Sequence, residues 1–214
     1  SAQLLGQKSM MNPEGGKVNT GHNHGGMKMD NGESEDGVDH SQMDMSNTTM
    51  EAETDHTDMN QRIITTDTFK GQLEEVFNAY IKLKDAFVSD DSGAASTLTK
   101  TLLSAMKKVD MKQLTDHNAH NHWMTISKEI TESATSISKI SDIEKQRGHF
   151  KHLSAHLSKG VKLFGVNQKV YEQFCPMADN NKGAYWLSLK EKIQNPYYGS
   201  KMLGCGDNKL VIIK

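Results

Sequence analysis

The first 60 residues of this chain lack the large side chains that build a hydrophobic core: they contain no Phe, Trp, Tyr or Ile. All aromatic residues of the 214-residue chain lie between Phe69 and Tyr198. A segment of this composition buries too little apolar surface to offset the entropy lost on ordering. We therefore expect residues 1–62 to form a disordered tail and residues 63–214 to form the folded domain.

Long apolar runs and a strong net charge are also missing. No stretch approaches the roughly 20 apolar residues that a membrane-spanning helix needs, so we expect no transmembrane segment. The net charge of −2 conceals two unlike parts. Residues 1–60 carry three Lys against eleven Asp or Glu, a charge of −8, which leaves +6 on the remainder. That positive charge is dispersed and accompanies no recognition motif, so we expect no nucleic-acid partner.

Cysteine is scarce, because Cys175 and Cys205 are the only two in the chain. Without a Cys-x-x-Cys motif or a βαβ pattern, thioredoxin-like chemistry is disfavoured, and we expect no enzyme. The pair would form either a metal site or a disulfide, and the disulfide would stabilise the fold by about 3–4 kcal/mol. Neither the cysteine count nor the N-terminus, which has no charged and apolar leader, decides the compartment.

Each cysteine has a methionine within three positions, in the runs Cys-Pro-Met and Met-x-x-Cys. Thiolate and thioether sulfur prefer Cu(I), whereas zinc sites rarely use methionine. Pro176 disfavours helical geometry at Cys175 and fixes its own φ, so we expect a turned or extended run in which Cys175 and Met177 can face one ion. Two glycines flank Cys205 and allow its backbone to approach closely. The predicted main Cu(I) site consists of Cys175, Met177, Met202 and Cys205.

The acidic tail contains a repeated array of histidine and methionine. His24 is followed by two methionines at a spacing that recurs sixteen residues later from His40, and in part again from His56. Neutral imidazole binds Cu(II) or Cu(I), and thioether binds Cu(I). The alternative is low complexity with incidental histidines. The predicted weaker ligands of the tail are His22, His24, Met27, Met29, His40, Met43, Met45, His56 and Met59.

The remainder reads as helices, because apolar residues recur at spacings of three and four. We expect helices over about residues 66–90, 94–109, 116–140 and 141–164, the last opened by a capping box at Ser141. Short connections make neighbouring helices run antiparallel. The prediction is an all-α fold, an antiparallel four-helix bundle with an irregular C-terminal Cys/Met segment. Only residues 210–213 hint at a strand.

Three histidines share one flank of the fourth predicted helix, outside its apolar stripe: His149, His152 and His156. They could meet one ion, and His117, His120 and His122 near the start of the third helix could add ligands. No acidic ligand or third fixed ligand accompanies them locally. A solvated flank is the simpler interpretation of both groups.

The C-terminal motifs also carry a resemblance to a known family. They are Val170-Tyr171, Phe174-Cys175-Pro176-Met177-Ala178, Gly183-Ala184, Trp186-Leu187-Ser188, Asn195-Pro196-Tyr197-Tyr198-Gly199, Met202-Leu203 and Cys205-Gly206. Together with the run from Tyr80 to Phe87 and with Gln146-Arg147, they resemble a bacterial envelope domain of formerly unknown function. That domain occurs alone or fused to periplasmic adaptor (membrane-fusion) subunits of copper and silver efflux systems. The resemblance covers roughly residues 70–206.

The resemblance implies a helical domain, periplasmic or lipid-anchored, that handles copper. The adaptor's hairpin and barrel are missing here, so a free-standing protein that sequesters or delivers Cu(I) fits better than an efflux adaptor. Ag(I) and Cu(II) are further candidate ions, and a copper/silver efflux system is the candidate partner. The alternative is a disulfide-stapled interaction module of such a system, in which only the tail binds metal.

Overall fold

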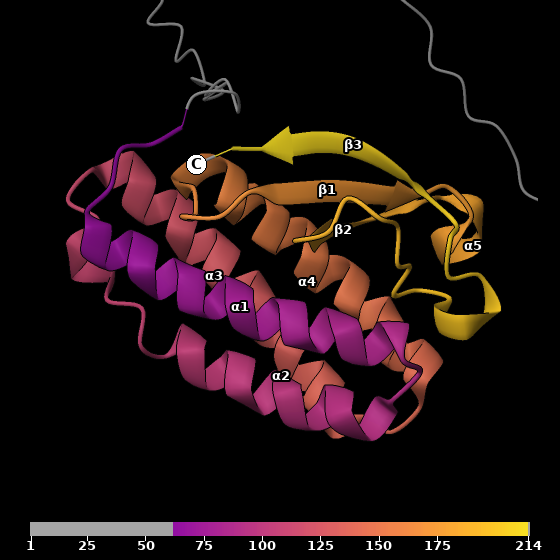
Figure 1. Cartoon of the computed structure of the whole chain (residues 1–214). Coiled ribbons are helices and arrows are strands. Elements are labelled where there is room, and N and C mark those ends of the chain that lie inside the picture. Colours follow the sequence, from indigo (N-terminus) through magenta and orange to yellow (C-terminus); the bar gives the residue numbers. More distant parts are fainter. Residues whose placement is uncertain (1–61, 214) are drawn as a thin grey trace, which may run out of the picture. The chain divides into compact units, whose positions relative to one another are not determined.

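The computed structural model describes residues 62–213, and Figure 1 shows their course. Four long helices are followed by a small sheet whose strands alternate with short helices. The elements are α1 (Asp67–Val88), α2 (Ser92–Met106), η1 (Met111–Gln113), α3 (His117–Lys139), α4 (Ile143–Phe164), β1 (Val170–Cys175), α5 (Ala178–Asn181), β2 (Ala184–Ser188), η2 (Gly199–Lys201) and β3 (Asp207–Ile212), where η1 and η2 are 3₁₀ helices. The nine predicted ligands of the tail lie outside the described residues.

The four long helices begin at polar caps. Thr66, Asp91, Asp116 and Asp142 each accept a hydrogen bond from the backbone N–H three residues further on. Such a cap typically contributes about 1 kcal/mol. The cap of α4 is Asp142, one residue beyond the predicted Ser141. The four predicted helices are confirmed, with ends that differ by only a few residues.

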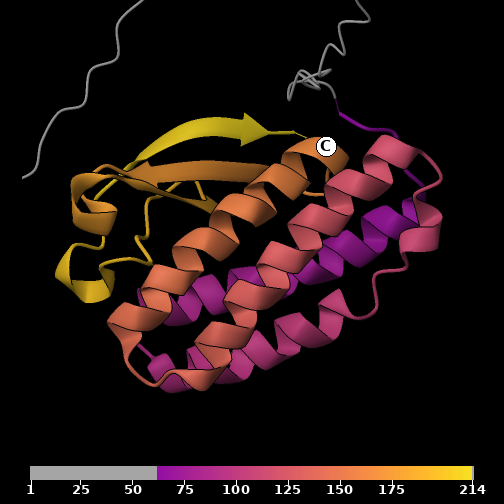
Figure 2. The same cartoon turned by 180° about the vertical axis from the view of Figure 1, so that it is seen from behind.

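Consecutive helices pack against one another in the order α1, α2, α3 and α4, and Figure 2 shows the bundle from behind. Their facing stripes supply the buried core, in which Phe69, Trp123 and Phe164 meet edge to face. Among residues 62–213, no helix combines the length and apolarity that crossing a bilayer requires. The fold is predominantly helical, and its core lies between the long helices.

The prediction of an all-α fold is wrong for the C-terminal part. β1 lies at the centre of an antiparallel sheet in the order β2-β1-β3. Five of the six residues of β1 are buried, including Glu172 and Gln173, so the strand shows no alternation of apolar and polar residues. Ser158 and Lys162 of α4 bind the Glu172 carboxylate, which offsets its burial. Sequence periodicity could not reveal a strand whose polar side chains find buried partners.

The two faces of the sheet have different neighbours. Glu172 points toward α4, where its partners lie. Because side chains alternate along a strand, Gln173 and Cys175 point to the opposite face. There the Gln173 amide donates hydrogen bonds to the carbonyls of Lys190 and Glu191 in the loop 189–206. That loop therefore covers the face that carries Cys175.

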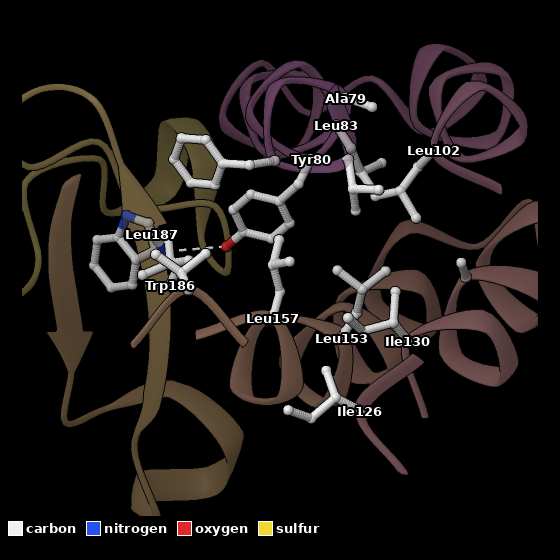
Figure 3. Close-up of a cluster of buried hydrophobic side chains, with 14 of the residues drawn as sticks. Ala79, Tyr80, Leu83, Leu102, Ile126, Ile130, Leu153, Leu157, Trp186 and Leu187 are labelled. Carbon is white, nitrogen blue, oxygen red and sulfur yellow. Dashed lines mark hydrogen bonds between the residues drawn. The ribbon is translucent and has the colours of Figure 1, made fainter. Parts of the chain in front are cut away.

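Tyr80 of α1 joins the bundle to the sheet, and we expect Tyr80→Phe to destabilise the protein. Its buried hydroxyl lies 2.9 Å from Ser154 Oγ and accepts the Leu187 N–H at 3.0 Å. Figure 3 shows this bond at the edge of the core cluster. The substitution leaves two buried polar groups without a partner, at a cost of about 1–3 kcal/mol. Urea unfolding measures the loss of stability. Tyr185→Phe is the control, because the Tyr185 ring is exposed. If Tyr80→Phe destabilises the protein no more than this control does, the role of the Tyr80 hydroxyl is contradicted.

Candidate metal centre

The two cysteines meet where β1 ends and β3 begins. Cys175 is the last residue of β1 and is fully buried, whereas Cys205 is half-buried in the loop before β3. The strands pair so that Phe174 lies opposite Asp207, which brings the two segments side by side. The two Sγ atoms are 3.0 Å apart, and both thiols are free. The structure thus brings together the two cysteines that the sequence singles out.

The separation of the two sulfur atoms lies between the values for a disulfide and for a metal chelate. A disulfide needs about 2.05 Å between the sulfur atoms. Two sulfur ligands at about 2.3 Å from one ion are about 3.8–4.6 Å apart, depending on the angle between them. At 3.0 Å, either state requires a sulfur displacement of about 1 Å. The donor set fits a soft ion once the pair opens, and it equally fits a disulfide once the pair closes.

The two thiols differ in their access to water, because Cys175 is fully buried and Cys205 is half-buried. Trp186 is fully buried, and its ring packs edge to face against Tyr197 at a centroid distance of 6.0 Å. The hydrogen bond with Cys175 and partial burial raise the pKa of Cys205 to about 11. The Cys205 thiol is therefore protonated at neutral pH, and a bound ion must displace its proton. Sulfur donors favour a soft monovalent ion over a hard one.

Both methionines of the predicted site lie in the same corner of the fold. The carbonyl of Met177, in the turn after β1, accepts a hydrogen bond from the Tyr198 hydroxyl at 2.6 Å. The carbonyl of Met202 accepts the Cys205 N–H at 3.1 Å. The Met177 side chain is 44% exposed, and Met202 is half-buried. The structure therefore unites the two thiols and places both methionine backbones beside them, while the four-sulfur site stays a prediction.

Asn195 holds the Cys205 loop in place, a role that the sequence analysis missed. Its side-chain amide donates to the Cys205 carbonyl at 2.8 Å, and its backbone N–H donates to the Leu203 carbonyl at 2.9 Å. Its Oδ1 atom accepts the backbone N–H groups of Tyr197 and Tyr198. The Asn-Pro dipeptide signals a turn, but nothing in the sequence signals that this side chain is buried.

Gly206 fixes the backbone beside Cys205, and we expect Gly206→Ala to disturb the thiol pair. A Cβ at this position would lie 2.7 Å from the Phe174 carbonyl oxygen and 2.8 Å from the Trp186 ring, and φ is +132°. We expect a loss of about 1–3 kcal/mol together with faster reaction of Cys205 with a thiol reagent.

Gly204→Ala is the matched control, because a Cβ there would meet nothing within 4 Å. It should change the stability by less than about 0.5 kcal/mol. Urea unfolding and the rate of thiol modification measure both variants. Equal behaviour of the two alanine variants would show that Gly206 does not position Cys205.

The histidines of α3 and α4 do not form a metal-binding group in the described part of the chain. Within residues 62–213, no three His, Cys, Asp or Glu side chains form a metal-binding group. His149 and His156 are half-buried on α4 and His152 is exposed, and His156 lies 3.8 Å from Glu129. Burial, followed by the nearby Lys151, lowers the pKa of His152. His117, His120 and His122 occupy the first two turns of α3. A histidine site stays a prediction without geometric support.

One family model matches part of the chain. Residues 76–169 match the family model described as "Protein of unknown function (DUF3347)". The match runs from within α1 to the residue before β1, so it covers most of the bundle and stops short of Cys175. No curated protein and no solved structure matches the chain. The comparisons thus show a match of part of the chain to this family and assign no chemistry to the thiol pair.

Proposed function

We propose that this protein binds copper in the bacterial envelope and sequesters or delivers Cu(I). The observation that carries the proposal is the pair of free thiols, 3.0 Å apart with Cys175 fully buried, and with a methionine in each flanking segment. Soft sulfur donors select Cu(I), and Ag(I) has the same preference. The resemblance of the C-terminal motifs to domains of copper and silver efflux systems supports the envelope location and an efflux partner.

The protein would work in two parts. The tail collects ions at weak imidazole and thioether ligands, and its acidic residues raise the local concentration of cations. The thiol pair holds one Cu(I) more tightly, because thiolate is the stronger donor for this ion. No bond in a substrate is made or broken, so storage and delivery require no catalysis.

Serine in place of the nine tail ligands should lower the copper capacity of the full chain and leave the tight site intact. Equilibrium dialysis against Cu(I) should give several ions for the native chain and one for the variant. A control chain with tail Asn and Thr residues changed to Ser should retain the native capacity. Equal capacity of the variant and the native chain would remove the tail from the proposal.

The second candidate function is an interaction module stapled by a Cys175–Cys205 disulfide, in which only the tail binds metal. The close approach of the two Sγ atoms favours it, because closure needs little movement. A domain that keeps this disulfide through reducing purification and binds no copper would support the module. Two free thiols and one bound Cu(I) would exclude it.

A further inference from the structure

We propose that the Cys175–Cys205 pair also reduces Cu(II) to Cu(I). The two thiols would form one disulfide and release two protons, and each of two Cu(II) ions would take one of the two electrons. The proposal rests on the proposed role in copper handling and adds an activity to it. Each reduced chain would complete the reaction once, so the pair acts as a stoichiometric reductant.

The geometry favours closure within one chain. The sulfur atoms are already in contact at 3.0 Å, and an approach of about 1 Å produces the S–S bond. Cys175 is fully buried, so a cysteine of a second molecule cannot reach it. Oxidation should therefore yield an internal disulfide and no disulfide-linked dimer.

Cys205 is the side chain that an incoming ion meets first, because it is the more exposed of the two. One side of its loop is anchored, since Gly206 packs against Phe174 and Trp186. On the other side, Asn195 binds the carbonyls of Leu203 and Cys205, so the backbone is held there as well. A movement of the Cys205 side chain toward Cys175 would therefore close the S–S bond while the backbone and the start of β3 stay in place.

The chain carries ligands that prefer different oxidation states of copper, so reduction of Cu(II) would link them. Imidazole is a good ligand for Cu(II), whereas thiolate and thioether select Cu(I). The chain carries ten histidines as well as the methionine and cysteine ligands described above. An ion that arrives as Cu(II) must gain an electron before the sulfur ligands hold it well. Cys175 and Cys205 are the only cysteines of the chain, so they are its only dithiol reductant.

Formation of the disulfide would change which side chains bind the Cu(I) that the reaction produces. Once the disulfide forms, neither sulfur is a thiolate, so the pair no longer competes for the Cu(I) it has produced. Thioether ligands such as Met177 and Met202 need not lose a proton to bind that ion. A chain whose pair has become a disulfide would therefore leave Cu(I) to methionine ligands, whereas a reduced chain would hold it at the thiol pair.

The test uses the reduced full chain without oxygen, with four equivalents of Cu(II) as its glycine complex and bicinchoninate as the Cu(I) indicator. We expect two Cu(I) per chain, loss of both thiols, a mass decrease of 2 Da, and a peptide that links Cys175 to Cys205. The wild-type chain oxidised beforehand to the disulfide keeps every residue and is the matched control. It should produce no Cu(I) above the reagent background.

Cys205→Ser provides a second control, because it leaves a buried thiol without its partner. It should form no internal disulfide and should produce less than about one tenth of the wild-type Cu(I). Equal Cu(I) from the reduced and oxidised wild-type chains would overturn the proposal, as would oxidation to linked dimers. Binding of Cu(I) supplied directly is measured separately, so a chain that binds Cu(I) but fails to reduce Cu(II) would refute only the reduction.

Discussion

Replacing both Cys175 and Cys205 with Ser should lower the affinity of the folded domain for Cu(I) about a thousandfold, which corresponds to about 4 kcal/mol. A serine hydroxyl is a hard donor that stays protonated, so it replaces neither the charge nor the softness of a thiolate. The measurement is competition with bicinchoninate, in a full chain whose tail ligands are already Ser, so that only the body site is observed.

The methionine ligands should contribute less than the cysteines to the affinity for Cu(I), because a thioether carries no charge. Met124→Ser is the matched control, since Met124 is 47% exposed on α3, far along the chain from the thiol pair. It should leave the affinity unchanged. If the double Ser variant keeps its fold by circular dichroism and its affinity falls less than about threefold, the thiols are not the ligands.

Arg147→Met should cost about 3 kcal/mol of folding stability, at the upper end of the structural effects that we expect. The Arg147 side chain is 4% exposed, and its guanidinium donates to the Pro196 carbonyl, the Phe87 carbonyl and the Asp90 carboxylate. Asp90 in turn accepts two hydrogen bonds from Ser200. One side chain thus joins the end of α1, the start of α4 and the loop that leads to Cys205.

Methionine matches the length of arginine but leaves the Pro196 carbonyl without a donor and removes one hydrogen bond each from the Phe87 carbonyl and the Asp90 carboxylate. Lys145→Met, at an exposed position of the same helix, should change the stability by less than about 0.5 kcal/mol. Urea unfolding measures both, and similar midpoints would refute the role of Arg147. The Arg147 variant should also bind Cu(I) more weakly, because the loop before Cys205 loses an anchor.

A fall in pH should reduce the difference in folding stability between the native chain and the Arg147→Met variant. Hydrogen bonds from Ser200, followed by Arg147, hold the pKa of Asp90 well below its usual range. A carboxylate whose pKa is lowered on folding stabilises the protein above its unfolded pKa of about 3.9, and this stabilisation is lost as the pH falls further. The gap in stability should therefore be full at neutral pH and shrink below about pH 4.

The helices were predictable from the sequence because local signals agree with the tertiary structure. Polar caps such as Thr66 and Asp91 precede apolar residues at helical spacing, and both signals act within a few residues. Residues 210–213 indicated part of β3, but β1 was not predictable, since Glu172 and Gln173 interrupt its apolar pattern and find their partners on α4 and the loop 189–206. Those partners are distant in sequence and become visible only in the fold.

The candidate site was predictable in part, for a similar reason. The ligand types around Cys175 and Cys205 are a local property of two short motifs, and antiparallel pairing of β1 with β3 brings the motifs together. The residues that hold the motifs in place, Asn195 and Arg147, carry no such local signal. Their roles depend on backbone carbonyls that the fold leaves without other partners.

X-ray absorption at the copper edge is the most direct test of copper at the thiol pair. The sample is the full chain with Ser at the nine tail ligands, reduced and loaded with one equivalent of Cu(I). We predict a first shell of sulfur alone at about 2.3 Å, which the double Ser variant loses. A shell of nitrogen or oxygen at about 2.0 Å, unchanged in that variant, would contradict copper binding by Cys175 and Cys205.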